Sequence, residues 1–185
     1  MKKSFLKSFF ADKKMVGSMT PSSKFLTQKM LKNVDFKKAK LIVELGPGTG
    51  VFTEKILENL SSDAHLMIFE LNDGFFENLQ KRIVDPRIIW VNDSAEKIHE
   101  YLQKNGFLFA DYIISSIPLA NLPKKITENI LSDSYSCLKN QGKFIQFQYS
   151  LLSKKLIDNQ FQTVHISFTP LNIPPAFVYT CIKEK

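Results

Sequence analysis

From residue 41 onward, short runs of apolar residues alternate with stretches in which apolar and polar residues recur at helical spacing. The apolar runs are continuous, which is typical of strands in a parallel sheet that is covered on both faces. Strands that alternate with helices indicate βαβ units and a doubly wound α/β sheet. We predict five strands, at residues 41–45, 65–71, 87–92, 112–117 and 142–150. The intervening helices are predicted at residues 52–60, 73–83, 94–104 and 124–137.

The C-terminal part of the chain departs from this rhythm. Residues 161–169 and 175–183 both have the composition of strands, and the proline-rich connector between them is too short for a crossover helix. Two strands joined in this way are expected to pair antiparallel. The predicted fold is therefore Rossmann-like. It has a seven-stranded sheet of five parallel strands plus a C-terminal antiparallel hairpin, with helices on both faces.

The charge is distributed unevenly along the chain. The 185 residues carry a net charge of +7 and suit one domain of ordinary size. Residues 1–40 hold eleven lysines and two acids, whereas residues 41–185 hold fourteen basic and sixteen acidic residues. We therefore predict a basic, amphipathic helical arm at residues 1–38 and a folded domain at residues 39–185. Such an arm favours an anionic partner, either nucleic acid or an anionic membrane surface.

Composition also excludes several classes of protein. Hydrophobic residues make up 44% of the chain and charged residues 23%, so a disordered chain is not expected. Cys137 and Cys181 lie far apart and belong to no cluster with histidine, so we expect neither a disulfide framework nor a metal site. No apolar run reaches the length of a membrane-spanning helix. A reduced, cytoplasmic compartment fits these features.

The loop after the first predicted strand carries the first candidate chemistry. Residues 44–50 read Glu-Leu-Gly-Pro-Gly-Thr-Gly, and the glycines let the backbone turn sharply and let a ligand approach closely. Free N–H groups at the start of the next helix would face the same ligand. The spacing matches neither the dinucleotide fingerprint nor the phosphate-binding P-loop. Glu44 would repel a phosphate but tolerate a cation, such as the sulfonium and ammonium of S-adenosylmethionine (SAM).

The pattern E-x-G-x-G-x-G after the first strand resembles the SAM-binding loop of class I methyltransferases. The second strand ends at Glu70, 20 residues after Gly50, where an acid accepts hydrogen bonds from both ribose hydroxyls. The third strand is followed by Asn-Asp-Ser-Ala at residues 92–95, which resembles the family's turn beside the adenine. The resemblance implies SAM as the cofactor. The cofactor-binding residues that it implies are Glu44, Gly46, Pro47, Gly48, Thr49, Gly50, Glu70, Leu71, Asn72, Asp93, Ser94, Ala95, Ser115, Ser116, Pro118, Ser22 and Ser23.

The end of the fourth predicted strand bears on the methyl acceptor. Enzymes that methylate the amino group of adenine or glutamine carry an Asp or Asn here, followed after two residues by an aromatic residue. In this sequence Ser116 stands in place of the acid or amide, and Leu119 stands in place of the aromatic residue. A planar base would lose both a hydrogen bond and its stacking partner. A nucleic-acid substrate is therefore disfavoured despite the basic arm.

A longer series of segments resembles the bacterial phospholipid N-methyltransferases of the phosphatidylethanolamine type. Its more specific parts are Pro-Ser-Ser at 21–23, SSIPLANLP at 115–123 and LNIPPAFVY at 171–179. The resemblance runs over nearly the whole chain. It implies stepwise N-methylation of phosphatidylethanolamine towards phosphatidylcholine. Related enzymes that methylate other aminolipids, such as ornithine lipids, would look similar.

Two residues outside the cofactor set are candidate catalytic residues. Tyr149, at the end of the fifth predicted strand, would hold the substrate ammonium by cation–π attraction, and the alternative is a core tyrosine. Asn121 would form a hydrogen bond with the lipid head group. The resemblance implies that the N-terminal segment lies over the cofactor pocket, where Pro21, Ser22 and Ser23 would close it. Residues 20–23 also have the pattern of a helix start, with Thr20 as the N-cap and Pro21 at the first position.

The first sixteen residues have the pattern of an interfacial helix. On a helical wheel, five apolar residues fall within one arc of roughly 140°: Phe5, Leu6, Phe9, Phe10 and Val16. Most of the lysines lie outside this arc. An apolar face beside a lysine face favours binding to anionic lipid. The alternative is a helix packed on the domain with its lysines solvated. The sequence thus predicts a peripheral protein on the cytoplasmic, inner face of a membrane.

Two other classes of function stay open. An RNA (adenine) or protein N-methyltransferase would use the basic arm on an anionic partner. A non-catalytic membrane-binding module would keep the arm without binding SAM, and the intact glycine loop, Glu70 and Asp93 argue against it. Nothing in the sequence indicates an oligomeric state.

Overall fold

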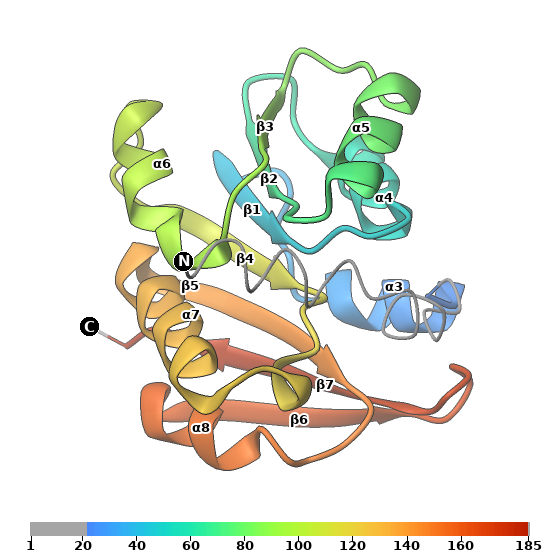
Figure 1. Ribbon diagram of the computed structural model, residues 1–185, viewed down its shortest axis with the longest axis vertical. Helices are drawn as coiled ribbons and strands as arrows, with labels where there is room; N and C mark the ends of the chain where they lie inside the picture. The colour runs from blue at the N-terminus through green and yellow to red at the C-terminus, as the bar shows by residue number, and fades with distance from the viewer. Residues whose placement is uncertain (1–21, 185) are drawn as a thin grey trace.

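A computed structural model describes residues 22–184 of the chain (Figure 1). Its centre is one seven-stranded sheet in the order β3-β2-β1-β4-β5-β7-β6. Strands β1 to β5 are parallel to one another, and β7 runs antiparallel to both β5 and β6. The predicted Rossmann-like α/β fold, with five parallel strands and a C-terminal antiparallel hairpin, is confirmed. The strands are β1 (Leu41–Leu45), β2 (His65–Phe69), β3 (Ile88–Val91), β4 (Ala110–Ser115), β5 (Leu138–Gln148), β6 (Thr163–Thr169) and β7 (Ala176–Ile182).

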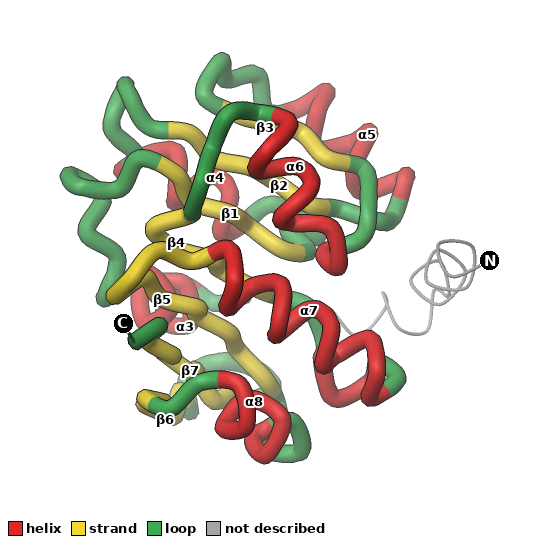
Figure 2. The backbone as a smooth tube through the Cα atoms, turned by 90° about the vertical axis from the view of Figure 1, so that its left-hand side faces the viewer, coloured by secondary structure: helices red, strands yellow, loops and turns green. Residues whose placement is uncertain are grey.

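Helices cover both faces of this sheet. Figure 2 looks onto the face that carries α6, α7 and α8, while α3, α4 and α5 lie on the far side. No helix among residues 22–184 is both long and apolar enough to cross a membrane. The helices are α3 (Lys24–Leu31), α4 (Val51–Asn59), α5 (Asp73–Arg82), α6 (Ile98–Lys104), α7 (Lys124–Cys137) and α8 (Lys154–Gln160), with short 3-10 helices η1 (Ala95–Lys97) and η2 (Leu119–Asn121).

The core is divided into two clusters by the sheet itself. Successive side chains of a strand point to opposite faces, so Val43 of β1 belongs to one cluster and Ile42 to the other. The first cluster packs under α6, α7 and α8, and the second packs under α3 and α4. All five residues of β1 are buried, which explains why its sequence is apolar almost throughout.

Helix α3 is part of the folded domain. Leu26 and Met30 are fully buried in the second cluster, together with Phe52 of α4. Ser23 is the N-cap, and its hydroxyl accepts a hydrogen bond from the backbone N–H of Leu26. The helix therefore begins at Lys24, later than the expected start with Thr20 as N-cap. The described part of the expected arm at residues 1–38 packs against the domain. The apolar arc and lysines of residues 1–16 lie outside the described residues.

One helix and one strand boundary differ most clearly from the sequence prediction. Helix α8 was not predicted, because its seven residues bury only Ile157 and so show no helical period of apolar positions. Strand β5 begins at Leu138, four residues before the expected start. The sequence did not indicate this part of the strand, because residues 139–141 are polar and exposed, as in a turn. Neither difference alters the order of the strands.

Candidate active site

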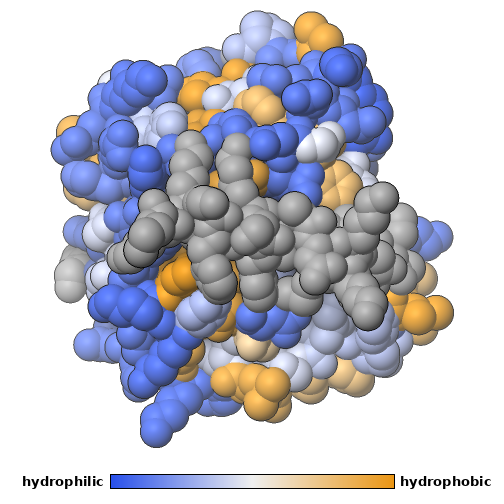
Figure 3. Space-filling model, viewed as in Figure 1, coloured by the Kyte–Doolittle hydropathy of each residue, from blue (hydrophilic) through white to orange (hydrophobic). Residues whose placement is uncertain are grey.

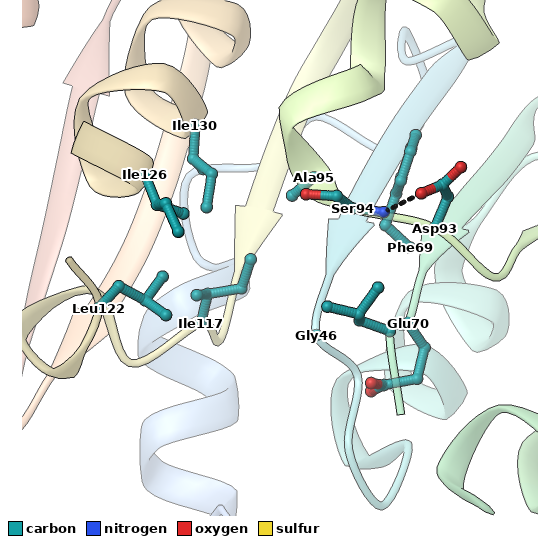
Figure 4. Close-up of a pocket in the computed structure, with 11 residues that line it drawn as sticks. Gly46, Phe69, Glu70, Asp93, Ser94, Ala95, Ile117, Leu122, Ile126 and Ile130 are labelled. Atoms are coloured by element: carbon teal, nitrogen blue, oxygen red, sulfur yellow. Dashed lines mark hydrogen bonds between the residues drawn. The ribbon is translucent and has the colours of Figure 1, made fainter. Parts of the chain in front are cut away.

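Six of the predicted cofactor residues line one hollow at the carboxyl edge of the parallel strands. Loops that follow β1, β2, β3 and β4 surround a hollow with an empty volume of about 400 Å³, part of which is open to solvent. Ligands of open α/β sheets bind at this edge. Figure 4 shows two unlike walls, with the polar strand ends on one side and aliphatic side chains on the other. The lining residues are Gly46, Phe69, Glu70, Leu71, Asp93, Ser94, Ala95, Ile117, Leu122, Ile126 and Ile130.

The glycine loop takes a conformation that side chains would obstruct. Gly46, Gly48 and Gly50 all have positive φ, between 56° and 85°. A Cβ on Gly50 would lie 2.6 Å from the side chain of Leu79, and one on Gly46 would lie 3.2 Å from the side chain of Ile117. The glycines are therefore required by the backbone and by close packing. Pro47 and Gly48 are buried in this loop, and Thr49 is exposed.

Glu70 lies directly beneath this loop. One carboxylate oxygen accepts from the N–H of Asn72 at 2.8 Å, and the other accepts from the N–H of Gly48 at 3.3 Å. Burial raises the pKa of Glu70 to about 7, although these backbone hydrogen bonds act in the opposite direction. In Figure 4 its carboxyl group points towards the Gly46 loop and away from Asp93. Neighbouring Leu71 is buried, and Asn72 caps α5 by accepting from the N–H of Phe75.

Glu44 is the second buried carboxyl group of the site. It is fully buried, and Thr53 donates its hydroxyl to Oε2 at 2.8 Å. Within the part of the chain that the structure describes, Oε1 has no hydrogen-bond partner. Burial is the main cause that raises the pKa of Glu44 to about 8, and the nearby Glu70 adds to it. A buried acceptor of this kind favours a ligand that brings a donor or a positive charge.

Asp93 forms the third acidic position, at the end of β3. One of its oxygens accepts from the N–H of Ser94 at 2.8 Å. The other is held by Lys97 Nζ at 3.1 Å and by the hydroxyl of Tyr101 at 3.2 Å. Ser94 in turn caps η1, which places Ala95 in the pocket wall. The carboxylate is thus fixed in place by residues of the helix that follows it.

These residues fit SAM, and the fit does not depend on any resemblance. The glycine loop leaves its backbone free of side chains. Glu70 offers a buried carboxylate that accepts hydrogen bonds from the backbone N–H groups of Gly48 and Asn72. Glu44 offers an unpartnered acceptor beside it. Two buried carboxyl groups with raised pKa values suit a ligand that carries hydroxyl donors and positive charge. In the described residues, no group of His, Cys, Asp and Glu side chains could hold a metal ion.

The wall opposite the acidic strand ends is formed by residues after β4 and at the start of α7. Ser115 is buried, and its hydroxyl accepts from the N–H of Ile117. The hydroxyl of Ser116 is buried without a partner among the described residues, and Pro118 precedes η2. Leu119 is fully buried in the core, so its side chain is not available to a substrate.

Asn121, Tyr149, Ser22 and Ser23 also lie outside the pocket lining, as do Glu44, Ser115 and Ser116. Asn121 is exposed in η2, and Tyr149 is 42% exposed just after β5, so Tyr149 is not a core tyrosine. Ser23 donates its N–H to Asn172 Oδ1 at 3.0 Å. Ser23 is thereby held against the connector between β6 and β7, and neither Ser22 nor Ser23 lines the pocket.

Sequence reasoning missed the aliphatic wall and Asn172. Ile126 and Ile130 are four residues apart on α7, a spacing that places them on one helix face, but the same spacing is found in any core helix. Asn172 is buried in the connector between β6 and β7, where a sequence rich in proline predicts only a turn. No sequence signal separates these residues from ordinary packing.

Comparisons with known proteins give matches to methyltransferases. The family model of the ribosomal RNA adenine dimethylases matches residues 10–157. An ornithine lipid N-methyltransferase from Singulisphaera acidiphila is 27% identical over 184 residues, which cover 97% of this chain and 96% of that protein.

Solved structures show the same fold. The N-methyltransferase NodS from Bradyrhizobium japonicum, in complex with S-adenosyl-L-homocysteine, aligns with a TM-score of 0.71 and 11% identity over 97% of this chain and all of that chain. A precorrin-6y C5,15-methyltransferase from Geobacter metallireducens aligns with a TM-score of 0.68 and 14% identity, over 90% of this chain and 92% of that chain. The predicted class I methyltransferase fold and SAM cofactor are confirmed. The chain belongs to the ribosomal RNA adenine dimethylase family of SAM-dependent methyltransferases.

Proposed function

We propose that this methyltransferase is an N-methyltransferase that acts on the amine head group of a membrane aminolipid. Phosphatidylethanolamine, methylated stepwise towards phosphatidylcholine, is one candidate substrate. An ornithine lipid is the other, because it is the substrate named for the relative that is 27% identical over nearly the full length of both chains. Both lipids present a primary amine at a membrane surface.

The observation that carries the proposal is the acceptor wall of the pocket. Leu122, Ile126 and Ile130 face the acidic strand ends, and the described lining holds no lysine, arginine or amide side chain on that side. A nucleobase needs a hydrogen-bond partner and a stacking surface. Leu119, at the position of the stacking residue, is buried in the core instead. An aliphatic wall favours an aliphatic amine and the glycerol or acyl part that follows it.

The chemistry follows from this environment. When bound, SAM would supply an electrophilic methyl group on its sulfonium. A neutral substrate amine would form the new N–C bond as the S–C bond breaks and S-adenosylhomocysteine leaves. The aliphatic wall excludes water and lowers the pKa of a substrate ammonium, which favours the neutral form. Tyr149 is 42% exposed just after β5, and its ring would hold an ammonium or methylated amine by cation–π attraction. Asn121 is exposed in η2 and would form a hydrogen bond with the head group.

RNA adenine methylation is the second candidate, and the family match over residues 10–157 favours it. The basic segment of residues 1–40 would then bind phosphates. Two residues oppose RNA adenine methylation. Ser116 stands in place of the acid or amide that would bond the adenine, and Leu119, in place of the stacking aromatic residue, is buried.

A methyl-transfer assay with different substrates tests the two candidate functions. The full chain is incubated with labelled SAM and, in separate reactions, vesicles of phosphatidylethanolamine, vesicles that contain an ornithine lipid, and ribosomal RNA. We expect label in a lipid and none in RNA. A Glu70→Gln variant controls for label that does not depend on the cofactor site. Label in RNA alone would overturn the proposal in favour of the second candidate.

A further inference from the structure

Two neighbouring loops at the carboxyl edge of the sheet expose their apolar residues and bury their polar ones. In the connector between β6 and β7, Leu171 and Ile173 are 62% and 79% exposed, whereas Asn172 between them is 2% exposed. In the loop between β5 and α8, Leu152 is 80% exposed, whereas Ser153 is 2% exposed. A loop that faces water normally shows the opposite pattern, because exposed apolar surface has a cost in free energy.

The two loops form one surface, which we name the apolar rim (residues 149–153 and 170–175). Gln148 at the end of β5 pairs with Phe177 at the start of β7, so both loops leave the sheet at the same edge. The side chain of Asn172 in the second loop lies near the hydroxyl of Tyr149 in the first, where it counters part of the rise that burial causes in the pKa of Tyr149. Figure 3 shows hydrophobic side chains along the lower and right-hand margins of this face, where Figure 1 draws the two loops.

The apolar rim is held in this arrangement by buried polar groups. Asn172 Nδ2 donates to the carbonyl of Pro174 at 2.7 Å, and its Oδ1 accepts from the N–H of Ser23. These bonds fix the backbone on both sides of Leu171 and Ile173. The outward direction of the two side chains is therefore built into the fold.

The rim continues into the methyl-acceptor pocket. Gln148, directly before the rim, donates its side-chain amide to the carbonyl of Ile117 at 3.0 Å, and Ile117 lines the pocket. A substrate that lies against the rim is thus next to the acceptor wall. Tyr149, which directly follows Gln148, is the first residue of the apolar rim and so lies between the rim and the pocket.

The charge around the rim fits an anionic surface. Lys154 and Lys155 directly follow the first loop, and neither loop contains an acid. Lys154 is paired with Asp158, which leaves Lys155 exposed without an ion-pair partner among the described residues. Apolar side chains flanked by lysines are typical of a surface that enters the interface of an anionic bilayer.

We propose that the apolar rim is a membrane-docking surface, which inserts Leu152, Leu171 and Ile173 into the interface of an anionic lipid bilayer and so presents the pocket to a lipid head group. This inference rests on the proposed function for its substrate. It assigns the docking role to the rim, in addition to any role of residues 1–16.

Vesicle sedimentation of the full chain tests the rim. The probe is a vesicle of equal parts phosphatidylethanolamine and phosphatidylglycerol. The L152Q/I173Q variant should partition onto it about tenfold more weakly than the wild type, because two interfacial aliphatic side chains are lost. The matched control is V84Q/L108Q, since these residues are 90% and 82% exposed in loops at the opposite, amino edge of the strands. The control should partition like the wild type.

Two outcomes would overturn the inference. One is equal partition of L152Q/I173Q and the wild type. The other is a change of oligomeric state in that variant without vesicles, measured by light scattering, which would make the rim a contact between copies of the chain. Thermal melting and SAM titration of both variants confirm that fold and cofactor site are intact.

A second readout separates this inference from the proposed function. Methyl transfer to the vesicle lipid should fall in L152Q/I173Q, whereas transfer to a soluble short-chain form of the same lipid should not change. If the wild type methylates neither form, the proposed function fails, while the sedimentation comparison still decides the docking role. If both forms lose methylation equally in the variant, the rim acts in the chemistry rather than in docking.

Discussion

Glu44 and Glu70 show at the scale of single residues how the fold prepares a site. Both carboxyl groups are buried, and burial raises the pKa of Glu70 to about 7 and that of Glu44 to about 8. The residue types were apparent in the sequence, but their burial was not. A surface glutamate at either position would be ionised well below neutral pH and would offer no such preference for a cation.

The first prediction concerns Glu70. In Glu70→Gln, the affinity for SAM should fall by about ten- to a hundredfold, because hydrogen bonds to a charged acceptor contribute about 1.5–3 kcal/mol. In the wild type the affinity should rise as the pH passes through about 7 and Glu70 ionises. The variant should show a weaker rise. Calorimetric titration at pH 6 and pH 8 measures both effects, with Glu58→Gln on the exposed face of α4 as control. Unchanged affinity would remove Glu70 from the cofactor site.

The second prediction concerns the stability of the protein without ligand. The pKa of Glu44 is higher in the folded chain than its ordinary value of 4.5, so the folded state holds the proton more tightly than the unfolded state. This contribution to stability is fully present below pH 4.5 and is lost as the pH rises through about 8. Glu44→Gln removes the ionisable group and keeps an acceptor for Thr53. At pH 9 the variant should melt a few degrees higher than the wild type, and at pH 5 the two should be close. A difference that did not change with pH would contradict this account.

At the scale of elements, the start of α3 and the hairpin of β6 and β7 are connected through Asn172. They are about 150 residues apart in sequence, and the direct link is the Ser23–Asn172 hydrogen bond. Lys29 of α3 also donates to the carbonyl of Phe168 in β6. The helix and both strands could be inferred from local patterns, whereas their contact depends on the sheet order, which places β7 beside β5.

The third prediction tests this connection. In Asn172→Ala, the free energy of unfolding should fall by about 1–3 kcal/mol, because the N–H of Ser23 and the carbonyl of Pro174 lose a buried partner. Urea denaturation measures the change. The matched control is Asn140→Ala, since Asn140 is exposed on β5. Equal stability of the two variants would show that the connection contributes nothing measurable.

At the scale of the whole molecule, basic and apolar features are divided between two parts of the chain. The net positive charge lies in residues 1–40, whereas the apolar rim lies beyond residue 148. Electrostatic attraction to anionic lipid is screened by salt, and apolar insertion is not. The two contributions to membrane binding can therefore be separated by ionic strength.

The fourth prediction uses this separation. Binding of the wild type to anionic vesicles should fall with salt but keep a residual part at high salt. Deletion of residues 1–16, which carry five lysines, should remove most of the salt-dependent part. The L152Q/I173Q variant should instead lose the residual part. Sedimentation at low and high salt measures both. A deletion variant whose binding kept the full salt dependence would reject the arm as an electrostatic anchor.

The sequence by itself determined the order of strands and helices, the glycine loop and the acidic residues at the ends of β2 and β3. These features are local, since the period of apolar residues and the spacing of glycines are set within a few residues. The tertiary structure alone decided that Ile126 and Ile130 form the aliphatic wall of the pocket, that Asn172 joins the β6–β7 connector to the start of α3, and that Leu119 is buried. Those features depend on which side chains a seven-stranded sheet brings together at one edge, and distance along the chain carries no record of that arrangement.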